Sequence, residues 1–154
     1  MTTAELTQPR PGRVSEFLDG ARRALPVVFA TAPFGLLFGA LAVQNGFTVG
    51  EAALMSATIF AGASQMVGLE LFGQKIAPWL IVLSIFAVNF RHVLYSAATG
   101  RLVRHWTPAQ RVFGFFFLTD PQYAESEKRN LDAGVSFVWY MGVATPLYVF
   151  WVAE

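Results

Sequence analysis

The sequence predicts an all-α fold, a polytopic membrane helical bundle of about four or five membrane segments that includes a broken or re-entrant helix. Apolar residues make up 55% of the 154 residues and charged residues only 14%, whereas soluble domains average about 25% charged residues. Several uncharged apolar runs are long enough for a helix to cross a hydrocarbon core of about 30 Å. Because these runs are continuous rather than alternating, they predict helices instead of a closed barrel.

Residues 1–24 are polar and precede the first apolar run. We expect residues 1–12 to form a tail without fixed structure, and residues 15–23 to form a short amphipathic helix on the membrane surface. By the positive-inside rule this end is cytoplasmic, because it carries Arg10, Arg13, Arg22 and Arg23. A secretory signal peptide is the rival interpretation, but the apolar run that follows contains two prolines and is long for a signal core. The remainder, 25–154, is expected to be a transmembrane permease domain.

Four apolar runs are expected to cross the membrane, at 25–43, 49–72, 77–100 and 133–153. Between the last two lie a basic loop, a run too short to cross and a charged loop, at 101–111, 112–119 and 125–132. If each long run crossed once, the arginine-rich loop 101–111 would lie outside, against the positive-inside rule. If the second run is a re-entrant hairpin that reverses at Gly62, the third run begins outside and ends in the cytoplasm. The loop 101–111 then lies in the cytoplasm, although Lys75 lies outside.

The middle of the run 77–100 carries Asn89, Arg91 and His92. A cation at that depth costs about 2.5–3.5 kcal/mol on insertion scales, so we expect it to face the protein interior or a water-filled cavity. At helical spacing Asn89 and His92 share a polar stripe, and Arg91 lies on an adjacent face. The alternatives are that Arg91 snorkels or pairs with a carboxylate only to hold the bundle together, and that His92 is a hydrogen-bonded packing residue.

The run 49–72 is interrupted by small and polar residues, Gly62, Ser64 and Gln65 among them. A glycine- and serine-rich interruption is typical of the discontinuous helices that build transporter binding sites. The alternative is a tightly packed helix in which Gln65 bonds to a neighbouring helix.

Two further features leave alternatives open. Asp120 ends the short apolar run and precedes Pro121, which cannot continue a hydrogen-bond ladder. The alternatives for Asp120 are an ion pair with Arg91, binding of a substrate ammonium, transfer of a proton, and a solvated carboxylate that begins a loop. In the first run, Gly35 and Gly39 form a GxxxG pair, which indicates close helix packing or, with the preceding proline, a broken helix.

The sequence gives no indication of an enzyme, a metal site or a cofactor. It contains no cysteine, only two histidines and none of the motifs HExxH, GxSxG, GxGxxG or the Walker loop. The formal net charge is +1, which does not point to a nucleic-acid partner.

Four motifs together resemble, in order and spacing, the AzlC family of branched-chain amino acid permeases, the large subunits of the azaleucine-resistance (LIV-E) exporters. They are PFGLLFG at 33–39, FAGASQ at 60–65, NFRHVLYSA at 89–97 and LTD at 118–120. The resemblance implies a bacterial inner-membrane exporter of valine, leucine, isoleucine or methionine that works with a small AzlD-type membrane subunit. It also implies a longer protein, of which this chain is the N-terminal two-thirds.

A zwitterionic substrate of that kind sets the expected roles of the polar residues. Its carboxylate needs a cation or a helix N-terminus, for which Arg91 and the backbone near Gly62 are candidates, and its ammonium needs Asp120. The expected binding residues are Arg91, Asp120, Asn89, His92, Gln65, Ser64 and Gly62, and the expected apolar lining is Phe34, Phe38, Phe60 and Phe90. The competing hypotheses are a passive channel and a non-transporting membrane scaffold.

Overall fold

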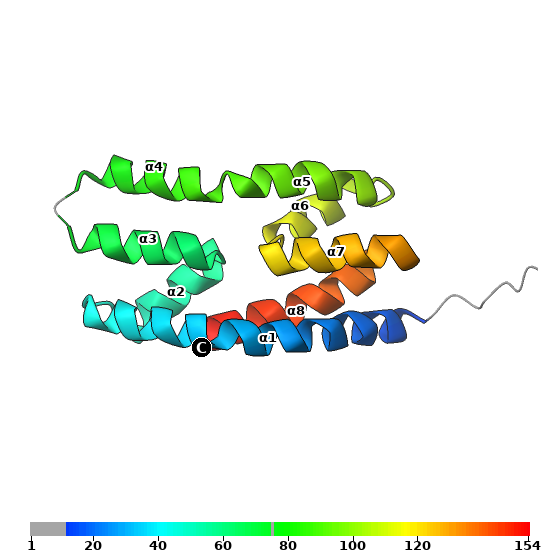
Figure 1. Cartoon of the computed structure of the whole chain (residues 1–154), viewed down its shortest axis with the longest axis horizontal. Coiled ribbons are helices and arrows are strands. Elements are labelled where there is room, and N and C mark those ends of the chain that lie inside the picture. The colour runs from blue at the N-terminus through cyan, green and yellow to red at the C-terminus, as the bar shows by residue number, and fades with distance from the viewer. Residues whose placement is uncertain (1–11, 75) are drawn as a thin grey trace, which may run out of the picture.

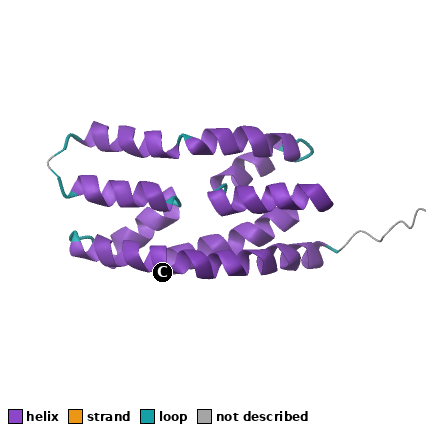
Figure 2. Cartoon of the chain, in the orientation of Figure 1, coloured by secondary structure: helices purple, strands orange, loops and turns teal. Residues whose placement is uncertain are grey.

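The fold is a bundle of helices. The computed structural model describes residues 12–74 and 76–154, and over those residues the chain is helical and contains no strand (Figures 1 and 2). The helices are α1 (Arg13–Gln44), α2 (Val49–Ile59), α3 (Gly62–Phe72), α4 (Pro78–Asn89), α5 (Arg91–Leu102), α6 (Pro108–Phe116), α7 (Asp120–Asp132) and α8 (Phe137–Ala153). This confirms the predicted all-α bundle. The expected tail before Gly12, with Arg10, lies outside the described residues, as does Lys75.

Among the described residues, two helical stretches are long and apolar enough to cross a membrane, Arg13–Gln44 and Pro78–Leu102, whereas the expected crossings at 49–72 and 133–153 form shorter helices. The first is α1, which continues through both of its prolines, so the residues expected to form a surface helix are the start of the same helix. The alternative of a helix broken after Pro33 is wrong, because a packed membrane helix tolerates the one hydrogen bond that proline removes. The second stretch consists of α4 and α5, which meet at Phe90 and lie on the opposite side of the molecule from α1 (Figure 1).

The second apolar run folds into a re-entrant hairpin of α2 and α3. The side chains of Thr48 and Glu51 form a capping box that begins α2, which ends at Phe60 in a left-handed conformation. The chain then turns back on itself, as Figure 1 shows. The rings of Phe47 and Phe72, from the two ends of this hairpin, lie 5.8 Å apart. Both ends of the hairpin are therefore at the same end of the molecule.

A second hairpin, of α6 and α7, corrects part of the sequence interpretation. The charged stretch 125–132 is the second half of α7 and not a loop. Pro121 occupies the first turn of α7. The N–H groups of a first turn have no partner within the helix, so the lack of an N–H in proline costs no hydrogen bond there, and Pro121 begins a helix instead of ending one. The Trp106 Nε1–H donates to the carbonyl of Val135 over 3.1 Å, which joins the segments before α6 and after α7. This hairpin enters from the end of the molecule opposite to the first (Figure 1).

α8 packs along α1 through close backbone contact. A methyl group added to Gly20 would clash with the backbone of Trp139, and one added to Gly142 would clash with the backbone of Phe17. Small residues allow membrane helices to approach this closely. The buried cluster beside the contact includes Trp139 and Tyr140, which are both fully inaccessible. The contact anchors α8 to the half of α1 that the sequence interpretation had separated from the membrane domain.

Positive charge is concentrated at one end of the molecule. With the exception of Arg91, the lysine and arginine residues of the described chain lie at the end that holds the start of α1, the α5–α6 turn and the end of α7 (Figure 1). They are Arg13, Arg22, Arg23, Arg101, Arg104, Arg111, Lys128 and Arg129. Asp19 joins two parts of this end, because its carboxylate contacts Arg23 at 3.4 Å and Arg129 at 3.2 Å.

Candidate functional site

Three interruptions of helical structure meet near the centre of the molecule. They are the α2–α3 break at Phe60, the α4–α5 break at Phe90 and the α6–α7 break at 117–119. Residues at or beside each break line common cavities. Irregular backbone is tolerated at membrane depth where it is buried in protein or borders a cavity, because its polar groups otherwise lack partners. The centre of the bundle is therefore the candidate site.

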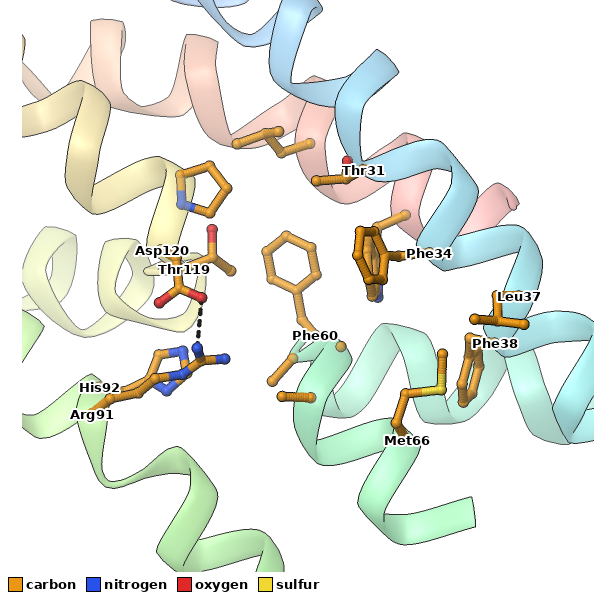
Figure 3. A pocket seen from close by; sticks show the side chains of 16 residues that line it. Thr31, Phe34, Leu37, Phe38, Phe60, Met66, Arg91, His92, Thr119 and Asp120 are labelled. Carbon is orange, nitrogen blue, oxygen red and sulfur yellow. Dashed lines mark ion pairs between the residues drawn. The ribbon is translucent and has the colours of Figure 1, made fainter. Parts of the chain in front are cut away.

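The main cavity has a volume of about 710 Å³ and lies between the two hairpin tips, α1, α5 and α8. Its lining consists of Thr31, Phe34, Leu37, Phe38, Phe60, Ala61, Gly62, Ala63, Met66, Arg91, His92, Thr119, Asp120, Pro121, Leu147 and Trp151. Figure 3 shows that the two walls differ in chemistry. Arg91, His92 and Asp120 lie on one side, and Phe34 and Phe38 lie on the other with Leu37 and Met66.

The polar wall centres on an ion pair between different elements. Nη1 of Arg91, the first residue of α5, lies 2.9 Å from Oδ2 of Asp120, the first residue of α7. The two side chains are 37% and 45% exposed, so both remain accessible from the cavity. Arg91 Nε and Asp120 Oδ1 are themselves buried and have no hydrogen-bond partner. The hydroxyl of Tyr95 in α5 also interacts with the Asp120 carboxylate. The Tyr95 and Tyr123 rings, stacked 4.7 Å apart, hold the same two helices together.

The first hairpin tip is tied to its surroundings by buried polar side chains. Gln65 is fully inaccessible; its Nε2–H donates to Ser56 Oγ in α2, and its Oε1 accepts from Trp151 Nε1 in α8, both over 2.9 Å. Ser64 is also fully inaccessible and donates to Asn89 Oδ1 over 2.6 Å. Both groups are hydrogen-bonded within the protein, so they hold the start of α3 in place.

A second, smaller cavity, shallower and more open than the main one, lies beside the same breaks. Its volume is about 230 Å³, and it is lined by Ile59, Phe60, Ala61, Asn89, His92, Phe115, Phe116 and Leu118. The residues that it shares with the main cavity are Phe60, Ala61 and His92. His92 Nδ1 lies 3.2 Å from the backbone carbonyl of Asn89, which can only accept, so this nitrogen carries the hydrogen. His92 Nε2 is the imidazole atom left for other partners.

The structure separates the expected binding residues into two groups. Arg91, His92, Asp120 and Gly62 come together around the main cavity. Asn89 lines only the second cavity, and Ser64 and Gln65 are buried behind the hairpin tip.

Among the expected apolar residues, Phe34, Phe38 and Phe60 line the main cavity, and Phe90 does not. Sequence reasoning missed Met66 and Trp151, because a methionine or a tryptophan in a membrane run is ordinarily a packing residue. Trp151 lies close to Gly62, because a methyl group added to this glycine would lie 2.9 Å from the indole ring, a contact that only the fold reveals.

The hairpins, the long apolar helices and the mid-depth cavity define a polytopic helical membrane protein. The AzlC protein family matches residues 26–154, and the chain belongs to this family. Its relatives include the inner membrane protein YgaZ of Escherichia coli K12, which is 30% identical over 148 residues, 94% of this chain and 60% of the relative.

Two further relatives are membrane proteins of other organisms. One, from Archaeoglobus fulgidus, is 34% identical over 133 residues, 83% of this chain and 60% of the relative. The other, from Helicobacter pylori, is 32% identical over 85 residues, 53% of this chain and 37% of the relative. The chain thus spans about 60% of the length of the first two relatives. No solved structure matches it.

Proposed function

We propose that this chain is a subunit of a permease that exports branched-chain amino acids, and that the main cavity holds the substrate. The observation that carries the proposal is the division of one mid-depth cavity into a charged wall and an apolar wall (Figure 3). A zwitterion with an aliphatic side chain needs both within a few ångströms of each other. Arg91 and Asp120 supply opposite charges at adjacent points, and Phe34, Leu37 and Phe38 supply the apolar surface.

The ion pair gives a mode of binding. The substrate carboxylate accepts from the guanidinium of Arg91, and the substrate ammonium donates to Asp120, so each charge of the zwitterion faces its opposite on the polar wall. The first turns of α3 and α7 reinforce the preference for a carboxylate. Both helices begin at the cavity without a side-chain cap, and their N–H groups carry the positive end of the helix dipole.

Family membership and charge asymmetry support the remaining assignments. Branched-chain amino acids and an AzlD-type small partner subunit are what the AzlC resemblance implies, and we carry both to this chain as proposals. The basic end is assigned to the cytoplasm by the positive-inside rule, which puts the start of α1 and the α5–α6 turn inside and the α3–α4 turn outside a bacterial inner membrane. The protein is accordingly proposed to transport and not to catalyse.

Efflux of preloaded radiolabelled leucine from cells tests the proposal. Cells that lack their own branched-chain exporters receive this chain with or without an AzlD-type subunit, together with Arg91→Ala and the control Arg101→Ala, which removes an exposed arginine at the basic end. We expect partner-dependent efflux that the Arg91 variant loses and the Arg101 variant keeps. Absence of efflux in every arm, with the protein shown to be in the membrane, would contradict the proposal.

The same experiment separates the competing functions. A passive channel gives efflux down a gradient but no uphill efflux, and collapse of the proton gradient leaves its flux unchanged. A scaffold gives no flux of its own, and Arg91→Ala then changes the amount of co-purified partner instead of leucine movement. Protein abundance in the membrane is measured in each arm so that flux is compared per molecule.

A further inference from the structure

Phe60 lies between the main cavity and the second cavity, and we propose that its side chain is the gate that separates two compartments of one translocation path. The inference rests on the proposed transport function and adds a moving part to it. Phe60 lines both cavities, and the residue is only 7% exposed. Figure 3 shows its ring between the polar wall and Phe34 on the apolar wall.

Of the three residues that the cavities share, Phe60 is the one suited to act as a gate. Ala61 has only a methyl group, which is too small to open or close a passage. His92 is fixed through Nδ1 to the carbonyl of Asn89. Phe60 carries the bulk of the partition, and rotation of its side chain leaves the bond from its N–H to the Ser56 carbonyl at the end of α2 in place.

The backbone of Phe60 supports the same assignment. Its φ and ψ are both 43°, a left-handed conformation, and it is the non-glycine residue with positive φ among the described residues. A bulky side chain adopts this region only when its surroundings impose it, and such residues concentrate at ligand clamps and switches. A glycine at this position would satisfy the backbone with less strain. The phenylalanine at this position therefore costs backbone strain that a glycine would avoid, as expected for a side chain with a functional role.

The ring of Phe60 packs against Tyr148 of α8, and Tyr148 is itself held by two other elements. The Tyr148 ring of α8 packs edge-on against Phe60 with 5.1 Å between ring centroids, and its hydroxyl donates to the carbonyl of Ala57 in α2 over 2.9 Å. Tyr148 also packs against Phe117 at the α6–α7 break, 5.3 Å away. Movement of either hairpin tip relative to α8 consequently changes the support of the Phe60 ring. This connects the gate to the elements that bear the ion pair.

Side-specific labelling of a single cysteine tests the gate without requiring transport. The chain has no cysteine of its own, so Ile59→Cys introduces one thiol that lines only the second cavity. A membrane-impermeant maleimide is added to right-side-out or to inverted membrane vesicles, and labelling is normalised to that after denaturation. We expect labelling from one side in the Ile59→Cys protein. With Phe60→Gly added, labelling from the other side rises at least tenfold.

Matched variants make the result specific to the ring of Phe60. Phe34→Ala removes an aromatic ring that lines only the main cavity, and Phe60→Tyr keeps a ring at the gate; both are expected to retain one-sided labelling. Phe60→Ala repeats the opening test in case the glycine variant does not reach the membrane. Labelling from both sides before any change at Phe60, or no gain after removal of its ring, would overturn the proposal. If the labelling changes as expected but the protein does not export leucine, the gate stands and the proposed substrate is contradicted.

Discussion

At the scale of single residues, Arg91 and Asp120 form an ion pair in which each side chain keeps one polar atom without a hydrogen-bond partner. Each comes from the first position of a helix that begins at the central cavity, and each retains a buried polar atom without a partner. A pair that served only to hold helices together would gain most from complete bonding, because an unpaired buried polar group costs about 1–3 kcal/mol. The incomplete pairing fits residues that exchange partners with a ligand.

Substrate analogues separate the roles of the two charges. In Arg91→Gln, we expect the affinity for leucine to fall about 10- to 100-fold, because a charged hydrogen bond contributes about 1.5–3 kcal/mol. The affinity for leucinol, which has no carboxylate, stays nearly unchanged. Asp120→Asn is expected to weaken leucine similarly and to spare 4-methylpentanoate, which has no ammonium. Ligand binding to the purified protein in detergent measures these affinities, and equal losses for all ligands would indicate a purely structural pair.

Gln65 represents the opposite kind of polar residue, one whose bonds are complete. Gln65→Met keeps the length of the side chain but leaves Ser56 and Trp151 without their partner. We expect the free energy of unfolding to fall by about 1–3 kcal/mol for each group left unpaired, with ligand affinity unchanged. Thermal unfolding in detergent measures the effect. Gln44→Met, at the exposed end of α1, is the control and should leave the melting temperature unchanged.

At the scale of elements, the sequence predicts the helices better than it predicts their ends. The uncharged runs and the interruption at Gly62 predict the first hairpin because apolar length and small residues are local properties. Pro121 was misinterpreted because proline is found both just after the end of a helix and in the first turn of a helix. Only the packing of α7 distinguishes these two positions. The pairing of Arg91 with Asp120 was one of several alternatives, since contact between residues distant in sequence depends on the fold. The left-handed Phe60 has no local signal at all.

The α1–α8 contact gives a prediction at this scale. Gly142→Ala places a methyl group against the backbone of Phe17, which cannot move aside as a flexible side chain would. We expect destabilisation of about 1–3 kcal/mol, as for overpacked cores. Gly50→Ala is the matched control, because its added methyl meets nothing within 4 Å and alanine is favoured over glycine in helices by about 0.5–1 kcal/mol. Melting temperatures in detergent should move in opposite directions, and equal shifts would contradict this packing.

At the scale of the whole molecule, two hairpins that enter from opposite ends account for the distribution of charge. Each hairpin returns the chain to the end from which it came, so α1 and the α4–α5 stretch run in opposite directions along the molecule (Figure 1). The α5–α6 turn with Arg104 and the end of α7 with Lys128 and Arg129 then lie at the same end of the molecule as the start of α1. The same arrangement brings the two hairpin tips to one depth, where they line the main cavity with α1, α5 and α8. Topology and site are thus consequences of the same two chain reversals.

Sidedness of the turns tests this topology directly. Single cysteines at Gln74, His105 and Asn130, all exposed, are introduced into a chain that has no other thiol. We expect an impermeant maleimide to label Gln74→Cys from the periplasmic side, and His105→Cys and Asn130→Cys only in inverted vesicles. The reason is that α2–α3 returns to its side of entry, so that only α4–α5 separates the first position from the other two. If the second apolar run instead crossed the membrane, Gln74 would be cytoplasmic and His105 periplasmic. Labelling of Gln74→Cys from the cytoplasmic side and of His105→Cys from the periplasmic side would exclude the re-entrant hairpin. It would also exclude the contact of the α2–α3 and α6–α7 tips around the main cavity.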